Sequence, residues 1–464
     1  MSLYSDRHCL VLGLGESGLA AAQWLARQGA RLRIADSRTV PPGREAIHSI
    51  APQAELICAP FSPQLLEGIE LLVISPGLDP REPVVQLARS RGIEITGEIE
   101  LFAQALREIG WRAESKLIAI TGTNGKTTTT ALCGELCRAA GLDAAVAGNI
   151  SPAALSELML RLDAGQRPDV WVLELSSFQL ETTRSLDADA AVILNVSDDH
   201  LDRHGDMQSY AQAKAAVFAG SGVQVLNRED VWVAGLGLAG RRVVDFGLSA
   251  PQGEAQYGIR QIEGEHYLCR GSEVLLAHSA LQLAGMHNLA NALAALALCE
   301  AIGLPREALL AGLRAFRGLP HRVERVARRE DGVDFYDDSK GTNVGATLAA
   351  LQGLGRRVVL IAGGDGKGQD FRPLSPALQT HARSMVLIGR DAARLAAETA
   401  DSAVPTQFAP SMEEAVLVAN FLAQAGDAVL LSPACASLDM FRNYAHRAQV
   451  FCDAVLQLPG VRRV

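Results

Sequence analysis

The sequence predicts an α/β protein of three domains: a Rossmann-like N-terminal domain, a central P-loop-type ATPase domain with a mixed or parallel sheet, and a Rossmann-like C-terminal domain. Three observations predict this fold. Short apolar runs alternate with helical patterns along most of the chain, which favours parallel sheets flanked by helices. Two glycine-rich turns, at Gly13–Gly18 and Thr121–Lys126, each join such a run to a helix. The chain has 464 residues, and about 150 residues per domain suggests roughly three domains.

The composition describes a folded chain with buried cores, since 48% of the residues are hydrophobic and 20% are charged. A net charge of −9 argues against nucleic acid as a partner, because phosphate backbones are bound by clustered basic residues. The eight cysteines are scattered and form neither a CxxC pair nor a zinc ribbon. No secretory signal and no apolar run of membrane-spanning length is found. We therefore expect a cytoplasmic protein with reduced thiols and no membrane insertion.

The first block is expected to form a domain over residues 1–97, and it contains the turn Gly13-Leu14-Gly15-Glu16-Ser17-Gly18. Such a GxGxxG turn lets backbone N–H groups approach a diphosphate, and an acidic residue, Asp36, ends the next strand. Taken alone, the pattern predicts NAD binding, although no later motif supplies a hydride-transfer site. A purely structural tight turn is the other interpretation. The predicted elements are strands at His8–Leu12, Arg31–Ala35, Ala54–Cys58 and Leu71–Ser75, and a helix at Ser17–Gln28.

The second block, expected over residues 98–318, carries a stronger motif, Thr121-Gly122-Thr123-Asn124-Gly125-Lys126-Thr127-Thr128, between an apolar strand and a helix. In such a P-loop the backbone cradles phosphates, the lysine reaches the β- and γ-phosphates, and the next hydroxyl holds Mg²⁺. Ile120 stands where the general pattern has its first glycine. The predicted elements are strands at Lys116–Thr121, Val170–Leu175 and Ala190–Asn195, helices at Lys126–Ala140 and Met286–Ile302, and a small antiparallel insertion within 223–277.

Two further stretches of this block place metal-binding residue types after strands. Glu174 ends a strand that follows the P-loop, from where an acid binds Mg²⁺ directly or through water. His200 follows the next strand, within Asp198-Asp199-His200, and is either a metal ligand or a packing residue. Lys214 stands among alanines in a helix, where a lysine usually lies on the solvated face.

The third block, expected over residues 319–464, alternates again, with predicted strands at Val333–Tyr336, Arg357–Ala362, Ser384–Ile388 and Ala428–Leu431.

Lysine is scarce in this chain. Of 43 Lys and Arg residues, only Lys116, Lys126, Lys214, Lys340 and Lys367 are lysines. A codon bias accounts for such a composition. Because arginine supplies surface charge as well as lysine does, we interpret a retained lysine as marking chemistry that needs a primary amine.

Taken together, the motifs resemble the Mur ligases of bacterial peptidoglycan synthesis. The resemblance rests on Gly122–Thr127, on Glu174-Leu175-Ser176-Ser177-Phe178-Gln179-Leu180-Glu181 and on Asp199-His200. It continues in order through Gly285–Ala292, Gly318–Arg322, Asp338–Asn343, Gly363–Lys367 and Ser432–Asp439, and so covers essentially the whole chain. The last two stretches are similar to those of the glutamate-adding members, and the lack of an Asp-Asn-Pro-Arg motif counts against the member that adds a diamino acid.

The resemblance implies an ATP-dependent ligase that adds D-glutamate to UDP-N-acetylmuramoyl-L-alanine and acts as a monomer. The N-terminal domain is implied to bind the UDP substrate, which accounts for a diphosphate turn without a nicotinamide. The central domain is implied to bind ATP and metal, and the C-terminal domain to bind glutamate and close over the site. The implied residues are Ser17, Asp36, Ser37, Arg38, Ser75, Gly77 and Asn149 for the UDP substrate; Gly122, Thr123, Asn124, Gly125, Lys126, Thr127, Thr128, Asn288, Asn291, Arg322, Asp338 and Lys340 for ATP; and Thr342, Lys367, Ser437, Leu438 and Tyr444 for glutamate.

The implied mechanism activates the substrate carboxylate as an acyl phosphate, which the glutamate amine attacks to give a tetrahedral intermediate before phosphate leaves. Phosphoryl transfer between two anions demands concentrated positive charge. Lys126 and two Mg²⁺ (or Mn²⁺) ions are implied to supply it, with one metal at Thr127 and Glu174 and the other at His200. Lysines at the place of Lys214 are carbamoylated by CO₂ in the resembling enzymes, which implies an anionic ligand for the second metal.

Several alternatives remain at this point. A related ligase could add another amino acid, such as L-glutamate, or act like folylpolyglutamate synthase, which would not be expected to need a diphosphate-binding domain. A nucleotide-binding regulator or motor and an NAD oxidoreductase are the other classes. Lys367 lies in a glycine-rich loop and could contact phosphate in place of glutamate. Tyr444 stands where the family often has phenylalanine, so the aromatic side chain at this position carries an additional hydroxyl group.

Overall fold

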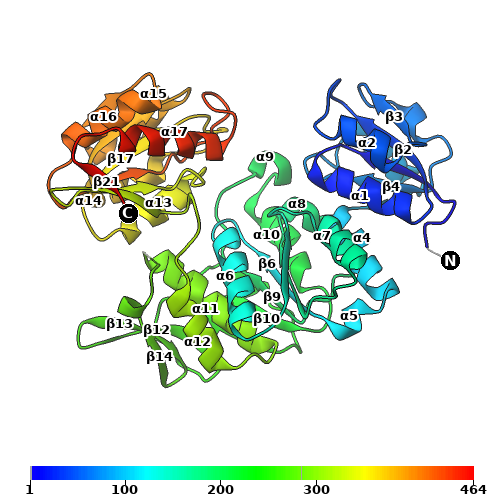
Figure 1. Cartoon of the computed structure of the whole chain (residues 1–464), viewed down its shortest axis with the longest axis horizontal. Helices are drawn as coiled ribbons and strands as arrows, with labels where there is room; N and C mark the ends of the chain where they lie inside the picture. The colour runs from blue at the N-terminus through cyan, green and yellow to red at the C-terminus, as the bar shows by residue number, and fades with distance from the viewer. Residues whose placement is uncertain (1–2, 284) are drawn as a thin grey trace.

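Three β-sheets organise the chain, one after another along the sequence (Figure 1). The structure is a computed structural model that describes residues 3–283 and 285–464. The N-terminal and C-terminal domains both lie on the upper side of the central domain in the view of Figure 1. The predicted three-domain α/β architecture is confirmed.

The N-terminal sheet has five parallel strands in the order β3-β2-β1-β4-β5. The order of the strands reverses between β1 and β4, and ligands bind at such a switch point beyond the carboxyl ends of the strands. Gly13 follows β1 and Ser75 follows β4, so both residues lie at this point. The strands are β1 (His8–Leu12), β2 (Arg31–Asp36), β3 (Glu55–Cys58), β4 (Leu71–Ile74) and β5 (Glu94–Thr96), with helices α1 (Glu16–Arg27), α2 (Arg44–Ile50) and α3 (Pro83–Ser90).

The central sheet has nine strands in the order β14-β13-β12-β11-β10-β9-β6-β8-β7. Its strands are β6 (Lys116–Thr121), β7 (Ala144–Gly148), β8 (Val170–Glu174), β9 (Ala190–Ile193), β10 (Val223–Asn227), β11 (Val243–Phe246), β12 (Gln256–Ile262), β13 (Glu265–Arg270) and β14 (Glu273–Ala277). Its helices are α4 (Glu98–Glu108), α5 (Trp111–Glu114), α6 (Lys126–Ala139), α7 (Ala154–Ala164), α8 (Ser177–Leu180), α9 (Leu201–His204), α10 (Met207–Ala215), α11 (Met286–Ala301) and α12 (Arg306–Ala315).

The prediction of a separate antiparallel insertion within 223–277 is wrong for most of that stretch. Strands β10, β11 and β12 continue the main sheet in parallel from β9, and only β12–β13 and β13–β14 pair antiparallel. Pairing direction depends on which strand edge the chain returns to, and the alternation of apolar and polar residues does not encode it.

The C-terminal sheet has seven strands in the order β19-β18-β17-β20-β16-β15-β21. Strands β16 to β20 are parallel, and β15 pairs antiparallel with β16 and β21. The strands are β15 (Glu324–Arg329), β16 (Asp334–Asp337), β17 (Val358–Gly363), β18 (Ala382–Ile388), β19 (Thr406–Phe408), β20 (Ala428–Leu431) and β21 (Val461–Arg463). The helices are α13 (Val344–Gly353), α14 (Ser375–His381), α15 (Ala392–Glu398), α16 (Met412–Leu422) and α17 (Tyr444–Leu456).

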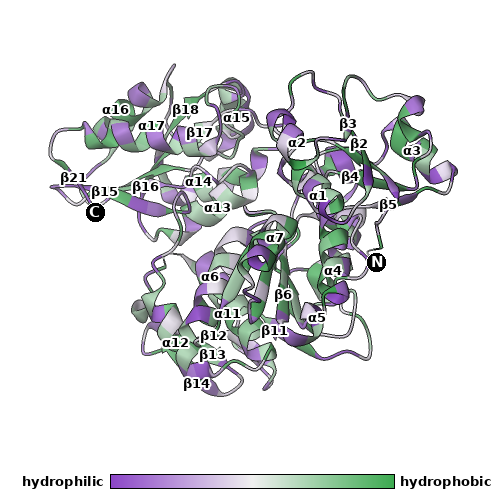
Figure 2. Cartoon of the chain, turned by 45° about the vertical axis from the view of Figure 1, so that its right-hand side comes forward, coloured by the Kyte–Doolittle hydropathy of each residue, from purple (hydrophilic) through white to green (hydrophobic). Residues whose placement is uncertain are grey.

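The cores lie between the sheets and their helices. The strands are mostly hydrophobic, and hydrophilic residues gather on outer helix faces and loops (Figure 2). Helix α11 is buried along most of its length and packs against α6, the helix that follows the P-loop. This packing fixes α6 and so the phosphate loop at its N-terminus. Within the described residues, no helix combines the length and the hydropathy that crossing a membrane requires.

Candidate active site

Two glycines shape the phosphate loop between β6 and α6. Gly122 has a φ of +151° and Gly125 a φ of +83°, conformations that other residues rarely adopt. A Cβ on Gly125 would lie 2.4 Å from Oδ1 of Asn291, and a Cβ on Gly122 would lie 2.9 Å from Cβ of Leu194. The loop therefore requires glycine at both positions. It runs into the N-terminus of a 14-residue helix, which favours negatively charged phosphate.

Asn195, which follows β9, holds the backbone of this loop from the side. Its Oδ1 accepts a hydrogen bond from the backbone N–H of Asn124 at 2.8 Å, and its Nδ2 donates to the carbonyl of Asn124 at 3.0 Å. The carbonyl of Asn195 accepts from the N–H of Thr123 at 2.8 Å. Asn195 was not among the sequence-predicted site residues, although an asparagine directly after an apolar strand was a visible signal.

Lys126 folds back over the loop. Its Nζ donates to the carbonyls of Gly122 and Thr123, each at 2.8 Å. Burial lowers the pKa of Lys126, and the charges of Glu174 and Asp199 oppose that effect. The ammonium is thus held at the phosphate loop by two neutral carbonyls, which a phosphate oxygen would replace as the stronger partner.

Glu174 and Thr127 provide oxygen atoms suited to a divalent cation. Oε1 of Glu174 accepts from Nδ2 of Asn149 at 2.7 Å, while its Oε2 is buried without a hydrogen-bond partner. The Thr127 hydroxyl is buried and accepts from Nη2 of Arg322 at 3.2 Å. An unpaired buried carboxylate oxygen is costly unless a cation or proton binds it. Hard oxygen donors of this kind fit Mg²⁺.

His200 lies close to this region, in a backbone conformation with a φ of +57°. Its ring packs edge-on against Phe178 with centroids 4.8 Å apart, and its Nε2 lies 3.6 Å from Oδ2 of Asp199. Burial lowers the pKa of His200, while Asp199 acts in the opposite direction. A neutral imidazole has the free lone pair that metal binding needs.

Lys214 is buried, which excludes the alternative interpretation of a lysine on a solvated helix face. Only 1% of its surface is exposed. Its Nζ donates to the carbonyl of Gly122 at 3.0 Å and lies 4.3 Å from the ring centroid of Tyr210. The Tyr210 hydroxyl in turn lies 3.2 Å from Oγ1 of Thr123. Burial, followed by the charge of Lys126, lowers the pKa of Lys214 well below its ordinary value.

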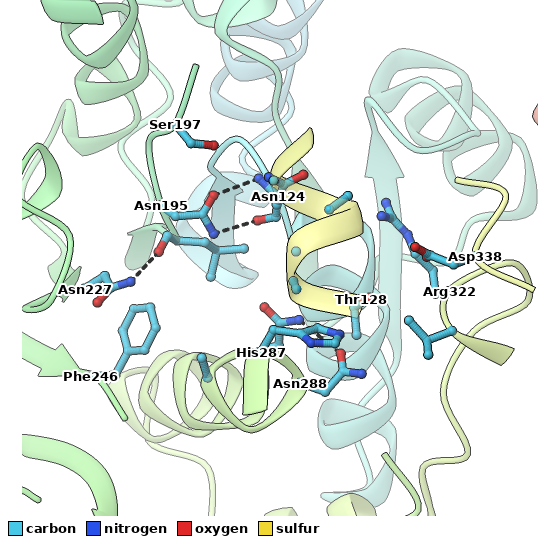
Figure 3. A pocket seen from close by; sticks show the side chains of 18 residues that line it. Asn124, Thr128, Asn195, Ser197, Asn227, Phe246, His287, Asn288, Arg322 and Asp338 are labelled. Carbon is cyan, nitrogen blue, oxygen red and sulfur yellow. Dashed lines mark hydrogen bonds between the residues drawn. The ribbon is translucent and has the colours of Figure 1, made fainter. Parts of the chain in front are cut away.

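A cavity of about 300 Å³ lies beside the phosphate loop (Figure 3). It brings together residues of all the predicted ATP segments, including Asn124 and Thr128 of the P-loop, Asn288 and Asn291 of α11, and Arg322 and Asp338 of the C-terminal domain. Asn227, Phe246 and His287 also line it and were not among the predicted site residues. Phe246 and Asn227 end the short strands β11 and β10, so only the fold reveals that they meet here.

Asp338 reaches this cavity as a buried carboxyl group. Its Oδ2 accepts from Oγ of Ser432 at 2.7 Å. Burial raises its pKa to about 7, with the Ser432 hydrogen bond and Arg322 acting in the opposite direction. Lys340, predicted with the ATP group, does not line the cavity; its Nζ lies 5.1 Å from the ring centroid of Tyr444 in the predicted glutamate group.

The predicted UDP residues of the N-terminal domain lie at the carboxyl ends of its strands, whereas Asn149 lies in the central domain beside Glu174. A Cβ on Gly18 would lie 1.8 Å from the carbonyl oxygen of Gly13, so the turn and α1 touch there. Ser75 is buried, and its Oγ donates to the same carbonyl at 2.9 Å. Ser17 is half-buried, while Ser37, Arg38 and Gly77 are exposed.

Asp36 is engaged within this domain. Its Oδ2 accepts from the N–H of Leu14 at 2.8 Å, and it forms an ion pair with Arg38 at 2.7 Å. Arg38 in particular lowers the pKa of Asp36 to about 2. In a dinucleotide-binding domain an acidic residue at this position binds the ribose. Here the Asp36 carboxylate is already bound by Leu14 and Arg38.

The predicted glutamate residues lie on loops at the carboxyl ends of β16, β17 and β20 and at the start of α17. The backbone of Asp365 exchanges two hydrogen bonds with that of Ala436, at 3.0 and 2.8 Å. This pair holds the loop of Lys367 beside the loop of Ser437. Lys367 and Leu438 are exposed, Ser437 is buried, and Thr342 and Tyr444 complete the group.

Three family models match the chain in sequence order. The Mur ligase MurD-like N-terminal domain matches residues 7–97, the Mur ligase middle domain matches 120–299, and the Mur ligase glutamate ligase domain matches 321–435. A protein of Aromatoleum aromaticum named UDP-N-acetylmuramoylalanine–D-glutamate ligase is 59% identical over 464 residues, which is 100% of both chains. The chain belongs to the Mur ligase family.

Other comparisons agree with this membership of the Mur ligases. A protein of the same name from Nitrosospira multiformis is 54% identical over 98% of this chain and 96% of that protein. MurF from Acinetobacter baumannii superimposes with a TM-score of 0.61 at 18% identity, covering 97% of this chain and 91% of that one. UDP-N-acetylmuramate-alanine ligase MurC from Thermotoga maritima gives 0.58 at 19% identity, covering 96% and 98%. These two structures show the shared Mur ligase fold.

Proposed function

We propose that this Mur ligase uses ATP to join D-glutamate to UDP-N-acetylmuramoyl-L-alanine, a step of peptidoglycan precursor synthesis. One observation carries the proposal: a single cavity faces both the phosphate loop and the start of the C-terminal domain. A nucleotide bound there is contacted by two domains at once. The choice of substrates is supported by relatives, 52–59% identical, that are named for this reaction.

The reaction first makes the substrate carboxylate a better acyl donor. Its oxygen attacks the γ-phosphorus of ATP, which gives an acyl phosphate and ADP. The amine of glutamate then adds to the acyl carbon, and the tetrahedral intermediate releases phosphate as the new amide loses a proton. Lys126 stabilises the phosphates by its charge, and the loop N–H groups hold them in place.

The oxygen donors of Thr127 and Glu174 fit a Mg²⁺ ion, as the unpaired Oε2 of Glu174 indicates. We propose that His200 contributes to a second ion. Bound there, Mg²⁺ or Mn²⁺ would screen the repulsion between the substrate carboxylate and the triphosphate. The Asn149 amide, which holds Oε1 of Glu174, orients this carboxylate.

We propose that Lys214 is carbamoylated. Its neutral amine adds to CO₂, the nitrogen loses a proton, and a carbamate anion results. Burial supports the neutral amine by lowering the pKa of Lys214. The product would be an anionic oxygen ligand close to the phosphate loop, where the amine now contacts the carbonyl of Gly122.

The remaining assignments follow the same proposal. Residues 1–97 would bind the UDP substrate, 98–318 ATP and metal, and 319–464 glutamate. Lys367 and Ser437 are proposed to hold the side-chain carboxylate of glutamate by charge-assisted hydrogen bonds. Support comes from the backbone pairing of Asp365 with Ala436, which places their loops side by side.

The test measures ADP release with and without each substrate. We expect release only when ATP, UDP-N-acetylmuramoyl-L-alanine and D-glutamate are all present. Replacing D-glutamate by L-glutamate tests the related ligase that adds another amino acid. The proposal would be refuted if ADP were released in the absence of UDP-N-acetylmuramoyl-L-alanine or of D-glutamate. It would also be refuted if ADP were released faster with L-glutamate than with D-glutamate.

A further inference from the structure

The C-terminal domain touches the phosphate loop through a hydrogen bond between two asparagine side chains, a contact that the proposed mechanism does not use. Nδ2 of Asn343, just before α13, donates to Oδ1 of Asn124 in the P-loop at 3.1 Å. The two residues are 219 positions apart in the sequence. This hydrogen bond links the glutamate-binding domain directly to the loop that binds phosphate.

The orientation of the Asn343 amide is fixed by its second role. Its Oδ1 accepts from the backbone N–H of Ala346 at 2.9 Å and so caps the N-terminus of α13. With the oxygen committed to the cap, the NH₂ group faces Asn124. One side chain therefore both begins the helix and reaches the other domain.

The contact is close, because Gly345 follows in the first turn of α13. A Cβ on Gly345 would lie 3.0 Å from Nδ2 of Asn124. The absence of a side chain there lets the first turn of α13 approach the P-loop. Gly345 and Ala346 also line the nucleotide cavity beside Asn124.

On its other side, Asn124 is held to the central sheet. Asn195 binds both the N–H and the carbonyl of Asn124. Three asparagines thus form a continuous chain of hydrogen bonds from the end of β9, through the P-loop, to the cap of α13. Thr342, in the predicted glutamate group, directly precedes Asn343.

We propose that the Asn124–Asn343 hydrogen bond is a latch that positions the glutamate-binding domain on the phosphate loop, and that Asn343 is a positioning residue for the incoming amino acid. The hydrogen bond fixes the position of the loop before α13 relative to the P-loop, and that loop contains Thr342. This role in glutamate binding rests on the proposed function. The latch itself is a property of the ligand-free chain and is tested separately.

The first experiment needs no substrate. Asn343→Ser keeps an N-cap for α13, but its hydroxyl is too short to reach Asn124. Asn124→Ala removes the other side chain and leaves the backbone that Asn195 holds. We expect small-angle scattering of the ligand-free chain to give a larger radius of gyration for both variants than for wild type. Scattering curves identical to wild type for both would overturn the latch, whatever reaction the protein catalyses.

The second experiment is a double-mutant cycle on the KM for D-glutamate. Loss of one neutral hydrogen bond should raise that KM about three- to tenfold in each single variant. Because both substitutions break the same contact, the Asn124→Ala/Asn343→Ser double variant should show no further increase. Independent effects that multiply in the double variant, or an unchanged KM for D-glutamate, would refute the positioning role.

A control separates the latch from a general loss of stability. Ser411 caps α16 by accepting from the N–H of Glu414 at 3.2 Å, and α16 lies on the outer side of the same domain (Figure 1). We expect Ser411→Ala to lower the unfolding midpoint without changing the KM for D-glutamate. If Ser411→Ala raised that KM as much as Asn343→Ser does, stability alone would explain both variants and the latch would be rejected. Failure of wild-type turnover would refute the proposed function and leave the scattering result standing.

Discussion

At the scale of single residues, Lys214 shows how the fold changes what a side chain can do. A buried ammonium with one carbonyl acceptor and one aromatic ring is poorly compensated, so the neutral amine is favoured. An arginine in this position would stay charged and has no primary amine. The burial of Lys214 thus gives a physical reason why a lysine is retained in an arginine-rich chain.

We predict that Lys214→Arg lowers turnover by about 100-fold or more. Arginine cannot form the proposed carbamate, so the preorganised anionic ligand near the phosphates is lost. Lys116→Arg is the matched control, since Lys116 is 55% exposed and pairs with Asp189 at 3.2 Å. ADP release, measured against bicarbonate concentration, checks both variants, and unfolding curves show that they are folded. Turnover of Lys214→Arg equal to that of Lys116→Arg would contradict the proposed carbamate.

The sequence motifs predicted seven of the 18 residues that line the nucleotide cavity, and those seven lie in short continuous stretches. They missed Asn227, Phe246 and His287 for different reasons. The first two come from ends of short strands whose neighbours are set only by the fold. His287 lies inside a recognised motif, but its position at the cavity depends on the packing of α11 against α13.

At the scale of elements, the glycines in the turn between β1 and α1 have different structural roles. Gly18 is a packing glycine, because a Cβ there would strike the carbonyl of Gly13. Gly15 has no atom within 4 Å of its Cβ position, and its φ of −78° suits any residue. Space beside Gly15 is therefore free for a diphosphate at the N-terminus of the helix.

We predict that Gly18→Ala destabilises the N-terminal domain by about 3 kcal/mol through overpacking. Gly15→Ala should leave the unfolding midpoint near that of wild type but raise the KM for the UDP substrate. Thermal unfolding and substrate titrations check the pair. Equal unfolding midpoints for the two variants would show that the close contact at Gly18 is not what requires glycine.

The strands that were predicted in the parallel parts of the three sheets were confirmed, with ends shifted by one or two residues, but the parallel strands β5, β7 and β19 were not predicted. A strand–helix–strand pattern has only one common handedness and pairing, so periodicity is sufficient there. It was not sufficient for β11 and β12, which add to the sheet in parallel through connections that contain no α-helix. The direction of those pairings came from tertiary contacts.

At the scale of the whole molecule, two glutamates meet at the start of α7: Glu16 from the N-terminal domain and Glu98 from α4 of the central domain. Glu16, in the GxGxxG turn, accepts from the Ser151 hydroxyl at 2.7 Å and from the N–H of Ala153 at 3.1 Å. Glu98 accepts from the N–H of Leu155 at 2.6 Å and keeps a buried, unpaired Oε2. The proposed diphosphate turn and the central domain therefore share one junction.

Burial raises the pKa of Glu98 from 4.5 to about 7. Between these values the folded chain keeps a proton that the unfolded chain releases, so stability falls as pH rises from about 4.5 to about 7. We predict a loss of up to about 3 kcal/mol over this interval, absent in Glu98→Gln. Unfolding midpoints between pH 5 and pH 8 test this, with exposed Glu16→Gln as the control. Parallel pH profiles for wild type and Glu98→Gln would exclude the effect.

The uneven exposure of the five lysines gives the protein a built-in set of chemical reporters. An amine-selective reagent meets Lys116 and Lys367 at the surface, reaches Lys126 and Lys340 only in part, and is kept from Lys214. Surface arginines do not react, so adducts on the lysines other than Lys116 would report on the phosphate loop or on the loops of the C-terminal domain beside it. Labelling of this chain can thus map ligand occupancy residue by residue, without any engineered probe.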